Sequence, residues 1–268
     1  DLHSFPTRRS SDLGNYFMGE TNKILCPEKT VLIPDLNASC SLAESCPADE
    51  FEQFVKAHPG HTVISYVNTT AGTKAVTDVV VTSSNAKQIV DALPKDTPII
   101  FGPDWNLGNY INGLTGRKMV LWNGACHVHE KFSVEKILQL KKEHPAAKIL
   151  AHPECKGPVI NIADKVGSTA ALLKYSIVDE AQEFIVATES GILNEMKKSA
   201  PQKTFIPAPP DDSTCACNEC NYMKLITLSK LYNCLKYEWP TIEVQPDLAR
   251  KAIKPIHKML EISKQLGL

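Results

Sequence analysis

Short apolar runs of high β-propensity alternate with helical stretches along most of this sequence, and this alternation constrains the fold more than any other feature. The runs cover residues 30–35, 62–68, 79–85, 98–104, 118–126, 148–155, 183–191 and 203–210. Such alternation is typical of an α/β fold with mostly parallel sheets. We therefore predict two α/β units, at about 60–145 and 147–210, and the end of a third within 15–59.

Several of the apolar runs are followed by small polar or reactive residues, in the tripeptides YVN, TSS, GAC, HPE and GST. In open α/β sheets the ligand crevice lies outside the carboxyl ends of the strands. We therefore expect these tripeptides to face one common site.

The composition excludes several classes of function. The chain has 29 Lys and Arg against 30 Asp and Glu, so no basic excess indicates nucleic acid or a membrane surface as a partner. No apolar run reaches the roughly 18 residues that a membrane span needs. The sequence has no P-loop, GxGxxG or GxSxG motif, which disfavours an NTPase, a simple dehydrogenase and a serine hydrolase.

The nine cysteines indicate metal binding or thiol chemistry. An odd number cannot pair completely, and a chain of this size needs no disulfides in place of a core. The first twenty residues lack the apolar segment of a secretory signal. We therefore expect a reducing cytoplasm, where thiols more often bind metal or react.

Three cysteines in small-residue turns, Cys40, Cys126 and Cys220, could hold a [4Fe–4S] cluster by three of its irons. The fourth iron would then act as a Lewis acid. Structural zinc at Cys215, Cys217 and Cys220 is the rival, although CxCxxC lacks a second CxxC pair. A lone buried cysteine is more often a small hydrophobic residue.

Two histidine-containing motifs follow predicted strands. His152 and Glu154 lie two residues apart, on one face of an extended segment, which suits a general acid/base pair as well as a solvated loop. His127 and His129, beside Cys126, invite interpretation as metal ligands. We interpret them instead as flanking surface histidines.

A set of neutral hydrogen-bonding residues occupies the predicted turns. Such side chains bind carboxylate and phosphate oxygens at helix N-termini, although each alone is more often a helix cap. The set comprises Tyr66, Asn68, Ser83, Ser168 and Thr169.

Ten ordered motifs together resemble the quinolinate synthase family, the A protein of de novo NAD synthesis, from about Phe17 to the C-terminus. They are MGETNKIL, PDLNASCSLAESCP, YVNTTAGTKA, VVTSSNA, PDWNLGNYI, WNGACHVHEKF, AHPEC, VGSTAALL, VATESGIL and CACNECNYMKLITL. The resemblance implies a pseudo-threefold arrangement of small three-layer parallel-sheet domains, each giving one cysteine to a central [4Fe–4S] cluster. The matching ligands are Cys40, Cys126 and Cys220, with Cys215 and Cys217 as a redox-sensitive pair beside them.

The resemblance also implies the domain boundaries. Residues 14–59 are expected to be the remnant of the first α/β domain, 60–146 the second, 147–235 the third, and 236–268 a C-terminal helical segment. Residues 1–13 are polar and aperiodic and are expected to be a foreign or disordered leader.

The implied reaction condenses iminoaspartate with dihydroxyacetone phosphate to quinolinate, with loss of phosphate and two waters. The cluster would act as a Lewis acid, without an electron-transfer partner. A transient contact with an aspartate oxidase or dehydrogenase would supply iminoaspartate. By the same resemblance, Glu154 is the acid/base, with His152 and Tyr66 beside it. Tyr66 and Asn68 form the substrate-binding YxN motif. Ser83, Ser168 and Thr169 contact anions.

One departure from the family pattern is large. The family begins with a further segment that bears a His-Tyr-Tyr strand end and an Asp-Ser turn, and nothing before Phe17 matches it. We therefore expect an incomplete first domain, very weak or no activity, and an exposed apolar surface. The competing hypotheses are a zinc- or thiol-stabilised α/β binding protein without catalysis, and an iron–sulfur dehydratase with other substrates.

Overall fold

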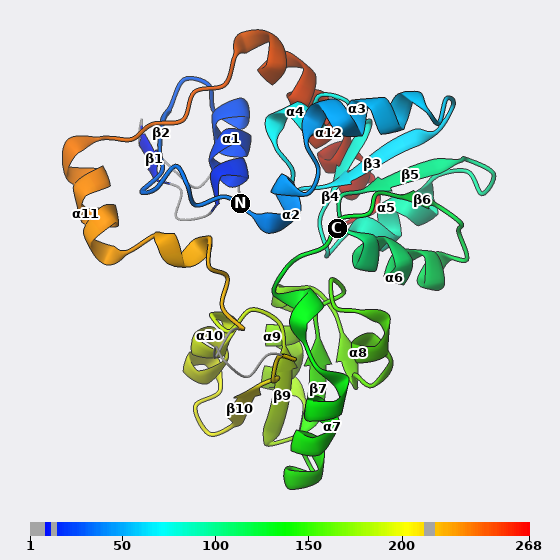
Figure 1. Cartoon of the computed structure of the whole chain (residues 1–268), viewed down its shortest axis with the longest axis vertical. Coiled ribbons are helices and arrows are strands. Elements are labelled where there is room, and N and C mark those ends of the chain that lie inside the picture. Colours follow the sequence, from blue (N-terminus) through cyan, green and yellow to red (C-terminus); the bar gives the residue numbers. More distant parts are fainter. Residues whose placement is uncertain (1–8, 12–14, 212–217) are drawn as a thin grey trace.

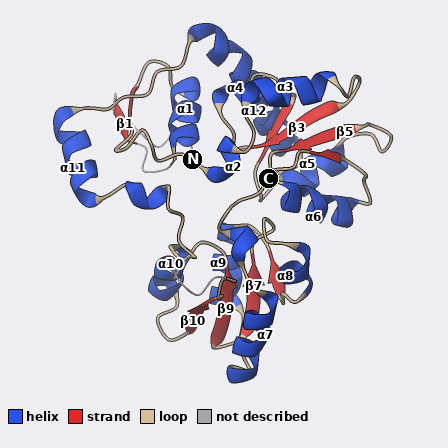
Figure 2. Ribbon diagram, in the orientation of Figure 1, coloured by secondary structure: helices blue, strands red, loops and turns tan. Residues whose placement is uncertain are grey.

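Two four-stranded parallel sheets form the scaffold of the computed structural model, which describes residues 9–11, 15–211 and 218–268 (Figures 1 and 2). The first sheet has the order β4-β3-β5-β6 and the second β10-β9-β7-β8. The first comprises β3 (Thr62–Tyr66), β4 (Val79–Val81), β5 (Ile99–Gly102) and β6 (Val120–Leu121). The second comprises β7 (Lys148–Ala151), β8 (Lys165–Val166), β9 (Glu183–Ala187) and β10 (Thr204–Pro207).

The two sheets are copies of one topology. In both, the first strand in the chain is central, the second lies on one side of it, and the third and fourth lie on the other. A hydrogen bond repeats as well: Asp78 Oδ2 accepts from the Val63 N–H at 2.8 Å, and Asp164 Oδ2 accepts from the Ile149 N–H at 2.7 Å. Each aspartate follows its partner by 15 residues. The predicted α/β class with parallel sheets, in two units, is therefore confirmed.

Helices connect and cover the strands. Around the first sheet they are α3 (Ala48–Lys56), α4 (Ala71–Lys74), α5 (Ala86–Ala92), α6 (Trp105–Thr115) and α12 (Pro246–Gln265). Around the second sheet they are α7 (Val134–Glu143), α8 (Gly157–Asn161), α9 (Thr169–Val178) and α10 (Ile192–Ser199). Side-chain N-caps begin several of them, as the sequence favours; Asp104 caps α6, Ser133 caps α7 and Ser168 caps α9.

A smaller lobe lies beside the first sheet (Figure 1). It holds α1 (Tyr16–Leu25), the parallel pair β1 (Arg9–Ser11) and β2 (Thr30–Leu32), and α11 (Leu228–Tyr237). The short α2 (Ser41–Glu44) lies between this lobe and the sheets, and 3-10 turns occupy His129–Lys131 and Met223–Leu225. Of the predicted leader, only residues 9–11 belong to the part that the structure describes.

The lobe exposes apolar side chains on and after α11. They include Leu228, Tyr232, Leu235, Tyr237 and Trp239, each at least half exposed. Among the described helices, none is both long and apolar enough to cross a membrane.

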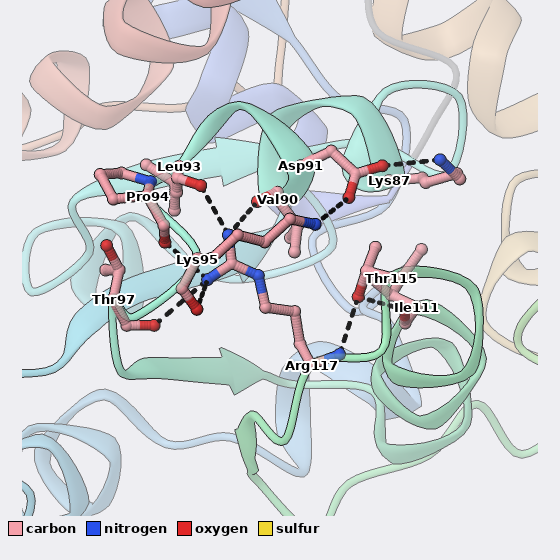
Figure 3. Close-up of polar contacts among 10 residues, drawn as sticks. All are labelled: Lys87, Val90, Asp91, Leu93, Pro94, Lys95, Thr97, Ile111, Thr115 and Arg117. Atoms are coloured by element: carbon pink, nitrogen blue, oxygen red, sulfur yellow. Dashed lines mark hydrogen bonds and ion pairs between the residues drawn. The ribbon is translucent and has the colours of Figure 1, made fainter.

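Two buried cations repeat at equivalent places in the two units. Arg117, just before β6, donates to five carbonyl oxygens at 2.6–3.5 Å in and after the end of α5 (Figure 3). Lys203, just before β10, donates to the Ser176 and Ile177 carbonyls at the end of α9. Each cation thus satisfies carbonyl groups that a helix C-terminus leaves without intrahelical partners, and joins that helix to the fourth strand.

We expect Arg117→Met to lower the free energy of unfolding by about 2–3 kcal/mol, because buried carbonyl groups would lose their donor. Arg117→Lys should recover only part of this loss. A single ammonium group cannot reach all the carbonyl oxygens that surround the wider, planar guanidinium. Urea denaturation measures both effects. The matched control is Lys118→Met, which removes an exposed neighbouring cation. Equal urea midpoints for Arg117→Met and the unmodified chain would contradict this role.

Candidate active site

The carboxyl ends of the two sheets meet around a cavity of about 690 Å³. Parallel strands of one sheet all end at the same edge, so residues that follow each strand are brought together there. The polar residues that line the cavity are Asn15, Cys40, Tyr66, Asn68, Ser83, Cys126, His129, His152, Glu154, Thr169, Thr188, Glu189, Glu195 and Cys220.

The strand ends place the residues that the sequence singled out. Tyr66 is the last residue of β3 and Asn68 lies in the turn after it. Ser83 follows β4, while His152 and Glu154 follow β7. Thr169 begins α9, so the N-terminus of that helix faces the cavity. Ser168, the N-cap of α9, is the neighbour of Thr169 and is not itself a lining residue.

Three cysteines reach the cavity from distant segments. Cys40 is the residue before α2, and Cys126 lies in the loop after β6. Cys220 is tied to the end of β9, because its N–H donates to Glu189 Oε1 at 3.3 Å. Cys215 and Cys217 lie outside the described residues.

Burial governs the protonation of two of these thiols. It raises the pKa of Cys40 to about 11, with a smaller contribution from the charge of Glu154. It also raises the pKa of Cys126 well above its usual value, again with Glu154 adding to the effect. Among the described lining residues, none is a lysine or arginine that could stabilise a thiolate. A cationic metal group is the kind of partner that would deprotonate them.

Glu154 is the charged centre of the cavity. Burial alone would raise its pKa, but the imidazoles of His152 and His129 and a hydrogen bond from Tyr66 outweigh burial and lower the pKa to about 2. Glu154 Oε2 lies 3.1 Å from His129 Nδ1, and Oε1 lies 3.7 Å from His152 Nδ1. The Tyr66 hydroxyl also interacts with Ser83, and burial raises the pKa of Tyr66 well above its usual value. The carboxylate is therefore ionised and held from three sides.

The interpretation of His129 as a surface histidine is wrong. Its side chain is buried, stacks on His152 at 4.9 Å between ring centroids, and places Nε2 3.0 Å from Thr188 Oγ1. His129 belongs to a 3-10 turn, and its short sequence segment has no periodicity that shows which way the ring faces. Thr188 was also missed, although it directly follows the β9 strand and its place at a strand end could have identified it.

A second buried carboxyl group lies near Glu154. Asp104 follows β5, and its Oδ1 accepts from the Leu107 N–H at 2.7 Å. Burial, together with the charge of Glu154, raises its pKa well above the usual value. We expect Asp104 to be neutral, so it adds no second negative charge beside Glu154.

Cys126, His129 and Glu154 form a potential metal site. One ligand atom from each lies within 4.8 Å of the others. A thiol, an imidazole and a carboxylate are ligands that zinc and other transition metals accept.

Comparison with known proteins gives the family. The family described as "NadA: Quinolinate synthetase A protein" matches residues 13–261. The chain belongs to the quinolinate synthase family. It is 54% identical to the quinolinate synthase of Synechococcus sp. over 250 residues, which is 93% of this chain and 78% of that protein.

Other quinolinate synthases are equally similar. The protein of Thermosynechococcus vestitus is 56% identical over 250 residues, and that of Chloroherpeton thalassium 53% identical over 251 residues. These alignments cover 93% and 94% of this chain, and 78% of each relative. The resemblance to quinolinate synthase that the motifs indicated is therefore confirmed.

We expect the stability of the metal-free chain to fall as pH drops from 6.5 to 4.5. Burial lowers the pKa of His152 from 6.5 to about 4, so the unfolded chain binds a proton in this range before the folded chain does. The expected loss is about 2 kcal/mol. Glu154, with its pKa near 2, contributes stability that is lost only below about 4.5, outside this window.

Urea denaturation at several pH values measures this dependence. His152→Gln should flatten the slope between pH 6.5 and 4.5, whereas the exposed control His257→Gln should leave it unchanged. An identical slope in His152→Gln and the unmodified chain would show that His152 is not the group responsible.

Proposed function

We propose that this chain is a quinolinate synthase of NAD biosynthesis, which condenses iminoaspartate with dihydroxyacetone phosphate to quinolinate. The observation that supports this most directly is the convergence of three cysteines with His152 and Glu154 on one cavity. These are the residues that match the family motifs. We further infer a cytoplasmic enzyme of three α/β domains in pseudo-threefold arrangement, to which an aspartate oxidase or dehydrogenase delivers iminoaspartate.

We assign Cys40, Cys126 and Cys220 as the ligands of a [4Fe–4S] cluster. Three observations support the fit. All three cysteines line the same cavity of about 690 Å³. Cys40 and Cys220 are buried, and the described lining residues include no lysine or arginine. Three cysteine ligands leave one iron without a protein ligand, which would supply Lewis-acid chemistry.

The overall reaction needs no oxidant or reductant. Iminoaspartate and dihydroxyacetone phosphate together contain the atoms of quinolinate, one phosphate and two waters. The side chains therefore have to bind two anionic substrates, orient them and move protons. This matches a cavity lined by neutral hydrogen-bonding groups, two imidazoles and the ionised carboxylate of Glu154.

Glu154 is proposed to accept and return protons. It is ionised, buried and fixed by Tyr66 and His129, so its oxygens have defined positions. A carboxylate with a pKa near 2 is a weak base, which suits protons that the reacting carbonyl and imine groups have made acidic. His152 is neutral near pH 7, because burial lowers its pKa to about 4, and it can exchange a proton with the substrate beside Glu154.

The substrate anions are proposed to bind through neutral donors, since the described lining residues of the cavity include no lysine or arginine. Thr169 and the capping residue Ser168 mark the N-terminus of α9, a ten-residue helix whose free N–H groups and dipole favour a phosphate. Asn68 and Ser83 line the same cavity and offer neutral donors to a carboxylate. Neutral donors bind an anion less strongly than paired cations, so release of quinolinate and phosphate is also favoured.

A binding protein with a single zinc ion is the second candidate. The cluster of Cys126, His129 and Glu154 favours it, because these three ligand atoms already lie within 4.8 Å of one another. In that case Cys40 and Cys220 would not be needed for metal binding.

Anaerobic reconstitution with iron and sulfide should give about four irons and four sulfides per chain. Cys40→Ala, Cys126→Ala and Cys220→Ala should each abolish stable binding, because two thiolates cannot hold the cluster. Cys26→Ala and Cys155→Ala are the controls, since neither residue lines the cavity. Iron, sulfide and zinc analysis measures the outcome. Zinc without sulfide, lost in Cys126→Ala and kept in Cys40→Ala, would overturn the quinolinate synthase assignment in favour of the zinc protein.

Glu154→Gln should lower quinolinate formation by about 100-fold or more, because the isosteric amide cannot accept a proton. Its iron and sulfide content should match that of the unmodified chain, since Glu154 is not one of the three proposed ligands. Product is measured by mass spectrometry, and Glu130→Gln serves as a nearby carboxylate control outside the cavity lining. A cluster-loaded Glu154→Gln chain with undiminished turnover would exclude Glu154 as the acid/base.

A further inference from the structure

The three cysteine-bearing segments touch one another outside the cavity as well as within it. Ser41, which directly follows Cys40, has its Oγ 2.8 Å from Nδ1 of His127. The same Oγ accepts a hydrogen bond from the His127 N–H at 3.2 Å. Because His127 directly follows Cys126, the serine hydroxyl joins the first cysteine segment to the second.

The third cysteine segment joins the same group of contacts through Tyr222, two residues after Cys220. The Tyr222 ring packs edge-on against the His127 ring, at 5.7 Å between centroids and 71° between planes. Its hydroxyl donates to Glu44 Oε2 at 2.5 Å, and Glu44 is the last residue of α2. The third segment therefore contacts both of the others.

We propose that Ser41, Glu44, His127 and Tyr222 form a latch that fixes the relative positions of Cys40, Cys126 and Cys220 before metal is bound. This inference rests on the cluster ligation proposed above. The four residues are positioning residues: none is among the cavity-lining residues, and each acts through a cysteine one, two or four positions away in the sequence.

The proposed ligands need such a device because of their spacing. Cys40 and Cys126 are 86 residues apart, as Ser41 and His127 also are, and the Cys220 segment is a further stretch of chain away. Each cysteine lies in a loop, outside the strands and helices, so the sheets alone do not fix its sulfur. Side chains held by packing and hydrogen bonds beyond the ligands are what set metal-ligand geometry in proteins.

A neighbouring contact supports the same interpretation. The indole Nε1 of Trp122, between β6 and Cys126, donates to the Ser45 carbonyl at 2.8 Å, just past the end of α2. The first two segments are thus joined on both sides of Cys126, whereas the latch contacts of Tyr222 are the ones that bring the third segment to them. Loss of the Tyr222 hydroxyl should consequently loosen the Cys220 segment most.

The test uses Tyr222→Phe and Ser41→Ala, which remove one hydroxyl each. In the metal-free chain, amide hydrogen exchange in residues 218–226 should rise roughly three- to tenfold in Tyr222→Phe, the change expected for one lost hydrogen bond. Ser41→Ala should produce a similar rise in residues 126–131. After reconstitution, a chelator should remove iron faster from both variants by a similar factor.

The control is Tyr175→Phe in α9. It removes a hydroxyl that accepts a hydrogen bond from Lys148 Nζ at 3.2 Å and that makes no contact with the latch. It should change neither the exchange of the cysteine segments nor iron release. Combining Tyr222→Phe with Glu44→Ala should loosen the Cys220 segment no more than either change alone, because the two side chains share one contact.

The exchange measurement separates this inference from the proposed function. If the unmodified chain takes up no iron and sulfide, the cluster assignment fails, while faster exchange in metal-free Tyr222→Phe still establishes the latch. Unchanged exchange of residues 218–226 in Tyr222→Phe overturns the latch, whatever metal the chain binds.

Discussion

The shared direction of the strands is the constraint on which the rest of the structure depends. In both four-stranded sheets all neighbours are parallel, so every strand delivers its following residue to the same edge. The first and third strands of each unit are neighbours in the sheet. After the first strand the chain continues to one side of the sheet, and after the third strand it continues to the other side. A crevice opens at the carboxyl ends of these two strands. Tyr66 and His152 stand at the ends of the equivalent strands β3 and β7, and both line the cavity. One repeated topology thus provides both halves of the site.

Histidines, and no lysine or arginine among the described lining residues, stabilise the buried negative charge of Glu154. An ionised carboxylate as buried as Glu154 is costly unless other groups stabilise it. Two imidazoles and the Tyr66 hydroxyl surround it, while burial keeps Asp104 and the nearby thiols neutral. A lysine or arginine in the same place would bind Glu154 more tightly and hold it away from a substrate. The histidines leave the carboxylate ionised, as the proton exchange proposed for it requires.

The sequence predicted the scaffold well because the signals were long and periodic. Runs such as 62–68 and 183–191 are continuous, β-branched and bounded by turns, and both form central strands. The two-residue strand β8 was missed because it is not part of a longer apolar run, whereas the equally short β6 lies within the predicted run 118–126. Helix α11 was missed because it packs few residues into the core; of its described residues only Cys234 is buried. The strand-end rule predicted that Tyr66, Ser83, His152 and Glu154 share one site, and all four line the cavity. It could not predict His129, whose position depends on a single 3-10 turn.

The large sequence separation of the proposed ligands favours folding of the chain before metal binding. Small zinc domains take their ligands from one short segment and fold around the metal, since no preformed site exists without it. Here the ligands are spread over Cys40, Cys126 and Cys220, and a cluster would have to close loops of about ninety residues if it organised them itself. The Trp122 contact with Ser45 and the contacts among Ser41, His127 and Tyr222 involve none of the three cysteine sulfurs. We therefore infer that these contacts bring the three cysteine segments together, and that a metal group would bind ligands that already converge.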